Sequence, residues 1–196
     1  MDEQALVSAA RRGDVQAFNT LILQYQTMVF NVAFRILHDE DAASDATQEA
    51  FISAFRALHS FRGGSFKAWV LRIVVNACYD QLRKTKRQPT SSLDDMLMDP
   101  DHSDLLDDHS ETPEEYVMRG ALSAAIQAGL DSLPPDQRAV IVLSDVQELS
   151  YEEIAQATGV SLGTVKSRLS RGRARMRDYL LRRRELEPMR HRLSSG

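Results

Sequence analysis

Near its C-terminal end the chain carries hydroxyl and cationic side chains at spacings that fit one face of a helix. They are Ser161, Thr164, Lys166, Ser167, Arg168, Ser170, Arg171 and Arg175. The major groove of B-DNA admits one α-helix, and side chains of these types bind base edges and the flanking phosphates. The pattern therefore predicts a helix that presents these side chains outward to duplex DNA.

A short helix and a tight turn are expected to hold this basic helix in place. Ser150 followed by Glu153 predicts a capping box that opens a helix over 151–157. Gly159 supplies the left-handed backbone that the turn requires, and Ser161 is the expected cap of a helix over 161–184. Apolar side chains are spaced to pack the two helices: Ile154, Ala155, Val160, Val165 and Leu169. These features favour a helix-turn-helix over a solvated basic helix in a structural hairpin.

A second candidate nucleic-acid surface mixes aromatic, amide and cationic side chains over residues 60–86. Its members are Phe61, Arg62, Phe66, Trp69, Arg72, Asn76, Asp80, Arg83 and Lys84. Aromatic rings stack on unpaired bases, which contributes about 1–3 kcal/mol of binding free energy per base, and cationic side chains bind the nucleic-acid backbone. Composition alone favours the alternative that the aromatic rings are core, Trp69 in particular.

Apolar residues at steps of three and four predict helices throughout, so the fold class is all-α. The first block is expected to have helices over 18–37, 39–58 and 66–86, with Asp39 as a cap and a loop at 60–65. Phe51 and Phe55 of its second helix are expected to point inward with the alanines. The second block is expected to have helices over 113–130, 135–146, 151–157 and 161–184.

Charge divides the chain of 196 residues, whose net charge is −4, into two blocks. Residues 88–118 hold ten acidic side chains and no basic one. Prolines and loss of periodicity predict a flexible acidic linker over 88–113. The expected domains are then 1–87 and 114–187, followed by a short tail at 188–196.

The composition argues against several classes of function. The single cysteine, Cys78, excludes a disulfide framework and a multi-thiolate zinc site, and it is expected to be a buried core residue. The chain shows no nucleophile triad, glycine-rich phosphate loop or metal-ligand spacing, so we expect no enzyme activity, cofactor, metal or small-molecule substrate. With no signal peptide and no long apolar run, we expect a cytoplasmic protein without membrane insertion.

Two sets of motifs resemble extracytoplasmic-function (ECF) sigma factors of bacterial RNA polymerase. The runs DAASDATQEAF (41–51), FRG (61–63) and FKAWVLRIVVN (66–76) resemble region 2 of that family. The runs LPPDQR (133–138), LSYEEIA (149–155) and GTVKSRLSRGR (163–173) resemble region 4. The resemblance covers nearly the whole chain in the family's order, and the linker stands where larger sigma factors have a middle domain.

The resemblance implies roles for the surfaces described above. The face with Asp41, Asp45, Gln48 and Glu49, which on residue types alone is a solvated face or a protein contact, would bind the β′ clamp of core RNA polymerase. The −10 promoter element would be bound, with one base flipped out, by the loop Ser60, Phe61, Arg62, Gly63, Gly64 and Ser65. Phe66, Trp69, Arg72, Asn76, Asp80, Arg83 and Lys84 would lie along the adjoining DNA. The basic helix would read the −35 element, earlier region 4 residues would meet the β flap, and an anti-sigma factor would be a further partner.

The resemblance implies that the linker threads the channel later used by nascent RNA, and the ten carboxylates of residues 88–118 would suit a groove built for phosphates. An acidic tether that avoids DNA is an equally weighted alternative. For the whole protein, the expectation is a sigma factor that binds core polymerase, recognises −35/−10 promoter DNA and promotes melting. A stand-alone helix-turn-helix regulator with a helical effector or dimerisation domain is the alternative, and a helical enzyme with a DNA-binding domain is a distant third.

Overall fold

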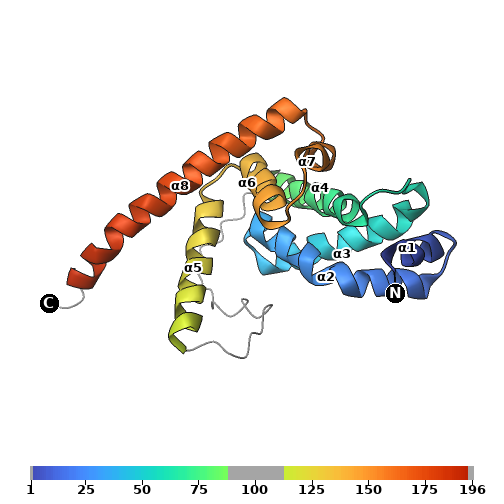
Figure 1. Cartoon of the computed structure of the whole chain (residues 1–196), viewed down its shortest axis with the longest axis horizontal. Coiled ribbons are helices and arrows are strands. Elements are labelled where there is room, and N and C mark those ends of the chain that lie inside the picture. Colours follow the sequence, from blue (N-terminus) through green and yellow to red (C-terminus); the bar gives the residue numbers. More distant parts are fainter. Residues whose placement is uncertain (1, 88–112, 194–196) are drawn as a thin grey trace.

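The computed structural model describes residues 2–87 and 113–193, and the regular elements in these ranges are all helical. The first half, residues 2–87, contains α1 (Glu3–Arg11), α2 (Val15–Leu37), α3 (Glu40–Ala57), a 3₁₀ turn (Leu58–Ser60) and α4 (Phe66–Arg87). The second half, residues 113–193, contains α5 (Pro113–Asp131), α6 (Pro135–Ile141), a π-helical turn (Val142–Val146), α7 (Tyr151–Thr158) and α8 (Leu162–Leu193) (Figure 1). The all-α prediction is confirmed. The predicted linker at 88–113 lies outside the described residues, except for Pro113.

The first half is a bundle in which α2, α3 and α4 pack on one another and α1 packs on α2. The predicted cap is present, since the Asp39 carboxylate accepts a hydrogen bond from the Ala42 amide at 2.7 Å. The inward stripe of α3 consists of small residues that allow close helix approach: Ala43, Ala46, Ala50 and Ala54, all fully buried. Phe55 lies one residue past this stripe and is 50% exposed, while part of its ring packs on buried Phe18 with the ring centroids 5.1 Å apart, so it points inward only in part.

The second half follows the predicted helices but differs at two ends. The helix that begins at Pro135 becomes a π-helical turn after Ile141, where the prediction continued it to Val146. The last helix continues to Leu193, so the prediction that it ends at Arg184 is wrong. The long run of arginine, leucine and glutamate after 184 favours helix and holds no breaker except Pro188.

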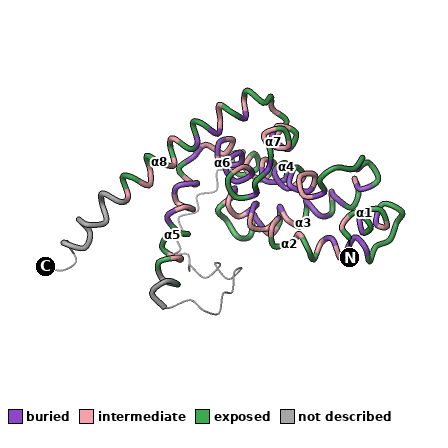
Figure 2. Tube along the Cα trace, in the orientation of Figure 1, coloured by how far each residue is buried: buried purple, intermediate pink, exposed green. Residues whose placement is uncertain are grey.

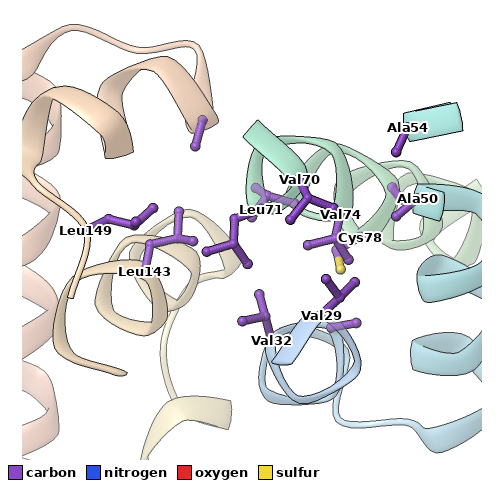
Figure 3. Close-up of a cluster of buried hydrophobic side chains, with 14 of the residues drawn as sticks. Val29, Val32, Ala50, Ala54, Val70, Leu71, Val74, Cys78, Leu143 and Leu149 are labelled. Atoms are coloured by element: carbon purple, nitrogen blue, oxygen red, sulfur yellow. The ribbon is translucent and has the colours of Figure 1, made fainter. Parts of the chain in front are cut away.

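The two halves pack directly against each other, which the sequence did not predict. α4 contacts α7, and α2 contacts α5, α6 and the π-helical turn. Figure 3 shows Leu71 of α4 on the side that faces Leu143 and Leu149 of the second half. Leu71 and Leu143 are fully buried, so one apolar core is continuous across both halves. Figure 2 shows the same buried zone where α4, α6 and α7 meet.

Candidate nucleic-acid interface

The helix-turn-helix predicted from the sequence is formed by α7, a turn at Gly159 and α8. Gly159 has a φ of +69°, and the Ser150–Glu153 capping box is complete, with the Glu153 carboxylate accepting from the Ser150 amide at 2.9 Å. Ile154, Val165 and Leu169 are buried between the two helices. The Ser161 hydroxyl accepts from the Thr164 amide at 3.2 Å, which confirms the predicted cap of α8. The motif therefore has a fixed geometry.

Val165 and Leu169 turn one side of α8 into the core, and the outward, solvent-exposed face of the helix includes Lys166 and Ser170. Both residues are exposed, as are Ser161, Arg171 and Arg175, whereas Thr164 and Ser167 are half-buried. The Arg171 guanidinium bends back along the helix and donates to the Ser167 carbonyl at 3.2 Å. This face offers cations and hydroxyls on a rigid helix, as major-groove binding requires.

Arg168 departs from the prediction that it points outward. Its Nε lies 2.9 Å from an Asp136 carboxylate oxygen of α6, and its side chain is only 22% exposed. The reason is the phase of α8, which places Arg168 at the edge of the buried stripe beside α6. Arg168 therefore forms an ion pair within the second half. Lys166, two residues earlier, is the nearest cation in sequence that is exposed on the outward face.

The structure adds Arg173 and Arg177 to the cations near this face. With Tyr151, Lys166 and Ser170 they line an open depression of about 450 Å³ beside the start of α7. Arg173 is held by Asp145, whose carboxylate accepts from its Nε at 3.1 Å and its Nη2 at 2.5 Å. These hydrogen bonds raise the pKa of the Arg173 guanidinium, so its charge is permanent. Both arginines follow Lys166 and Ser170 at steps of three and four, so the helical repeat could have predicted from the sequence that they lie on this side of α8.

The aromatic residues of the second candidate surface pack together in the first half. Phe61 and Phe66 are 6% and 2% exposed, and Trp69 is half-buried against both, with ring centroids 5.2 and 5.4 Å away. In this structure these rings belong to the core, which was the alternative favoured by composition. They anchor both ends of the loop at 61–66 and leave Arg62, Gly63, Gly64 and Ser65 exposed.

The polar part of that surface forms an exposed stripe along α4. Arg72, Asn76, Asp80, Arg83 and Lys84 are all exposed, at steps of four, four, three and one. Arg83 donates a hydrogen bond to the Asp80 carboxylate on the surface. The loop and this stripe are therefore adjacent and open to a ligand with a charged backbone.

The predicted protein-binding face of α3 is exposed as expected, at Asp41, Asp45, Gln48 and Glu49. The structure adds two apolar residues on the same side, Ile52 (46% exposed) and Phe55 (50% exposed). We call these six residues the α3 face. An acidic rim next to exposed apolar side chains is typical of a protein-binding surface. Ile52 was recognisable from its step of four after Gln48.

Comparisons with known proteins match both halves of the chain. Residues 21–88 match the family Sigma-70 region 2, and residues 123–176 match the family Sigma-70, region 4. The RNA polymerase sigma-H factor of Pseudomonas aeruginosa is 38% identical over 176 residues, covering 87% of this chain and 90% of that protein. The ECF RNA polymerase sigma-E factor of Escherichia coli K12 is 37% identical over 175 residues, covering 88% of this chain and 91% of that protein. The chain belongs to the ECF sigma factor family.

Other relatives of this sigma factor extend the comparison. The ECF RNA polymerase sigma factor SigE of Mycolicibacterium smegmatis is 39% identical over 164 residues, and the match spans 62% of that protein's length. The sigma factor RpoE of Bartonella quintana, solved with the anti-sigma factor NepR, matches with a TM-score of 0.65 and 27% identity, covering 85% of this chain and 98% of that one. CnrH, solved with the cytosolic domain of CnrY, has the same fold, with a TM-score of 0.63 and 24% identity over 91% of this chain and 96% of its own.

The described part of this sigma factor holds no group of three metal-ligating side chains, and none of its described helices is long and apolar enough to cross a membrane. Cys78 is fully buried in α4, as predicted. Burial raises the pKa of its thiol from its ordinary value of 9.0 to about 12.

Proposed function

We propose that this sigma factor binds core RNA polymerase, reads −10 and −35 promoter DNA through its two halves, and promotes melting without catalysing a reaction. One observation supports the proposal above all: α4 and α8 each have an exposed polar face, and they lie in the parts of the chain that match regions 2 and 4 respectively. The domains would be 1–87 and 114–187, joined by an acidic linker at 88–113. The site of action would be the cytoplasm, where the polymerase works.

The α3 face would bind the β′ clamp. Its carboxylates supply electrostatic complementarity to a basic partner, and Ile52 and Phe55 supply the apolar contact that an interface needs at its centre. The exposed apolar side chains Met118 and Leu122, one turn apart on α5, would meet the β flap.

The loop at 60–65 and the α4 stripe would bind the −10 element. Because Phe61 and Phe66 are buried, the flipped base would contact the exposed loop residues Arg62 to Ser65, and the rings would hold that loop in shape. Lys166, Ser170 and their neighbours on α8 would read the −35 element in the major groove. An anti-sigma factor would be a further partner, as it is for the B. quintana sigma factor.

The test is co-elution of the protein with core polymerase. Ile52→Asp and Phe55→Asp should each weaken the complex at least tenfold, since buried charges oppose an apolar contact. Leu23→Asp is the matched control, because Leu23 is an exposed apolar residue (69%) on the side of α2 away from the bundle core. Equal loss with the control, or no loss with either α3 variant, would contradict the assignment of the α3 face.

A further inference from the structure

The helix α1 packs on two parts of the first half that support the loop at 60–65. A helix of nine residues is only marginally stable alone in water, so α1 depends on these contacts. Leu6, Val7 and Ala10 are buried on one side of it. α1 contacts α2 and the 3₁₀ turn Leu58–Ser60, which leads into the loop (Figure 1).

Tyr25 of α2 links α1 to the residue that follows the loop. Its hydroxyl donates a hydrogen bond to the carboxylate of Glu3, which lies four residues before Val7 on the packed side of α1. Its ring packs on Phe66, with the ring centroids 5.4 Å apart. Burial, and after it the Glu3 carboxylate, raises the pKa of the Tyr25 hydroxyl, so this group keeps the proton that it donates. Tyr25 therefore contacts both α1 and the first residue of α4.

Phe66 also packs on the two other rings that hold the loop. Its ring centroid lies 5.9 Å from that of Phe61 and 5.4 Å from that of Trp69. Between Phe61 and Phe66 the side chains are exposed, and Gly63 and Gly64 have φ angles of +95° and +90°. Glycine has the greatest backbone freedom of any residue, so the shape of this loop depends on the rings at its two ends.

We propose that Glu3 and Tyr25 are positioning residues for −10 recognition: their hydrogen bond holds Phe66, and with it the ring cluster, in the place that shapes the loop at 60–65 for the DNA strand. They act through Phe66 and not by contact with DNA. The support of the loop rests on the contacts above, whereas its effect on −10 binding rests on the proposed function. A loop that is already in its bound shape loses less conformational freedom on binding, so it binds more tightly.

Amide hydrogen exchange in the free protein measures the support of the loop. One reporter is the Phe61 amide, which donates to the Leu58 carbonyl at 3.1 Å at the start of the loop. The other is the Trp69 amide, which donates to the Ser65 carbonyl at 3.1 Å at its end. Tyr25→Phe removes the donor and keeps the ring. Loss of a hydrogen bond to a charged group should make both amides exchange at least about tenfold faster.

Three comparisons separate this role from a general loss of stability. Glu3→Gln keeps an oxygen acceptor, so its reporters should exchange more slowly than those of Glu3→Ala, and adding Glu3→Ala to Tyr25→Phe should have no further effect, because both remove the same bond. Tyr79→Phe is the matched control, since the Tyr79 hydroxyl has no hydrogen-bond partner in the described part of the chain. The capped amides of Glu153 and Thr164 in the second half should keep the wild-type rate in every variant.

The effect on DNA binding is measured with the protein assembled with core polymerase, on DNA from a promoter that this holoenzyme transcribes. Tyr25→Ala removes the ring as well as the donor. Its affinity for a single strand with the −10 element should fall at least about tenfold, and its affinity for a duplex with only the −35 element should not change. Leu23→Ala, at an exposed position of the same helix, is the control and should leave both affinities unchanged.

Unchanged exchange of the Phe61 and Trp69 amides in Tyr25→Phe, or equal acceleration of the Glu153 and Thr164 amides, would overturn the positioning role. Binding of the −10 strand by Tyr25→Ala as tight as in the wild type would overturn its effect on DNA recognition. A sigma factor whose variants exchange as expected, but whose wild type binds neither core polymerase nor the −10 strand, would instead contradict the proposed function and leave the support of the loop standing.

Discussion

Replacing Lys166 and Arg168 in turn should separate a DNA-binding role from a structural one on the same helix. The two cations lie two residues apart, yet Lys166 is exposed, whereas Arg168 is 22% exposed and paired with Asp136 at 2.9 Å. Lys166→Met should therefore weaken promoter binding, and Arg168→Met should act on the stability of the second half.

The magnitudes follow from the two environments. Each phosphate contact contributes about 0.9 to the slope of log affinity against log salt concentration. Lys166→Met should make that slope shallower by about 0.9, so its defect should shrink about 3.5-fold between 50 and 200 mM salt. Arg168→Met should leave the slope unchanged and lower the free energy of unfolding by up to about 1 kcal/mol, since Asp136 is 41% exposed and solvent screens the pair.

The assay is a salt titration of each variant, assembled with core polymerase, on a duplex promoter fragment, together with urea unfolding of the free protein. Arg168→Lys serves as a control that keeps the charge and tests the pair with Asp136. An Arg168→Met slope that falls as much as that of Lys166→Met would refute the orientation of α8 described above.

Three further variants test the packing that positions the site. Ser150→Ala removes the capping box of α7 and should lower the free energy of unfolding, measured in urea, by about 1 kcal/mol. Ser150→Gly should lower it by less, and an equal loss for both variants would contradict the cap. Leu169→Ala leaves a cavity between α7 and α8 and should cost about 2–5 kcal/mol in the same assay, so a cost below 1 kcal/mol would show that the helices are not packed there. The raised pKa of Cys78 means that the thiol contributes stability below pH 9, which is lost as pH rises toward about 12. Unfolding followed from pH 8 to 11 should show this loss in the wild type and a smaller one in Cys78→Ala, and identical profiles would refute the assigned burial of the thiol.

Features that depend on neighbours in sequence were predictable. The caps at Asp39, Ser150 and Ser161 and the turn at Gly159 are each set by side chains and backbone within four residues. The burial of Cys78 was likewise foreseen from the apolar stripe of its helix.

Features that depend on the rotation of a helix about its axis, or on contacts between residues far apart in sequence, could not be predicted. Phe55 directly follows the alanine stripe of α3, and its aromatic ring suggested burial, although its position on the helix leaves it half exposed. The charge of Arg168 suggested exposure to solvent, although its position on α8 turns its side chain toward α6. The packing of the two halves joins Lys67 to Gln147 and Ile36 to Arg138, pairs about eighty and one hundred positions apart. Helical periodicity identifies the apolar side of each helix, but it does not say which two apolar sides pack against each other.

The central claim is tested most directly by mixing the purified protein with core RNA polymerase and mapping transcripts from a genomic fragment library. The account predicts a stable complex that starts transcripts downstream of one shared −35/−10 pattern, with core polymerase alone giving none. No complex with core polymerase, together with tight binding of the protein alone to a symmetric site, would contradict the account and favour a stand-alone regulator.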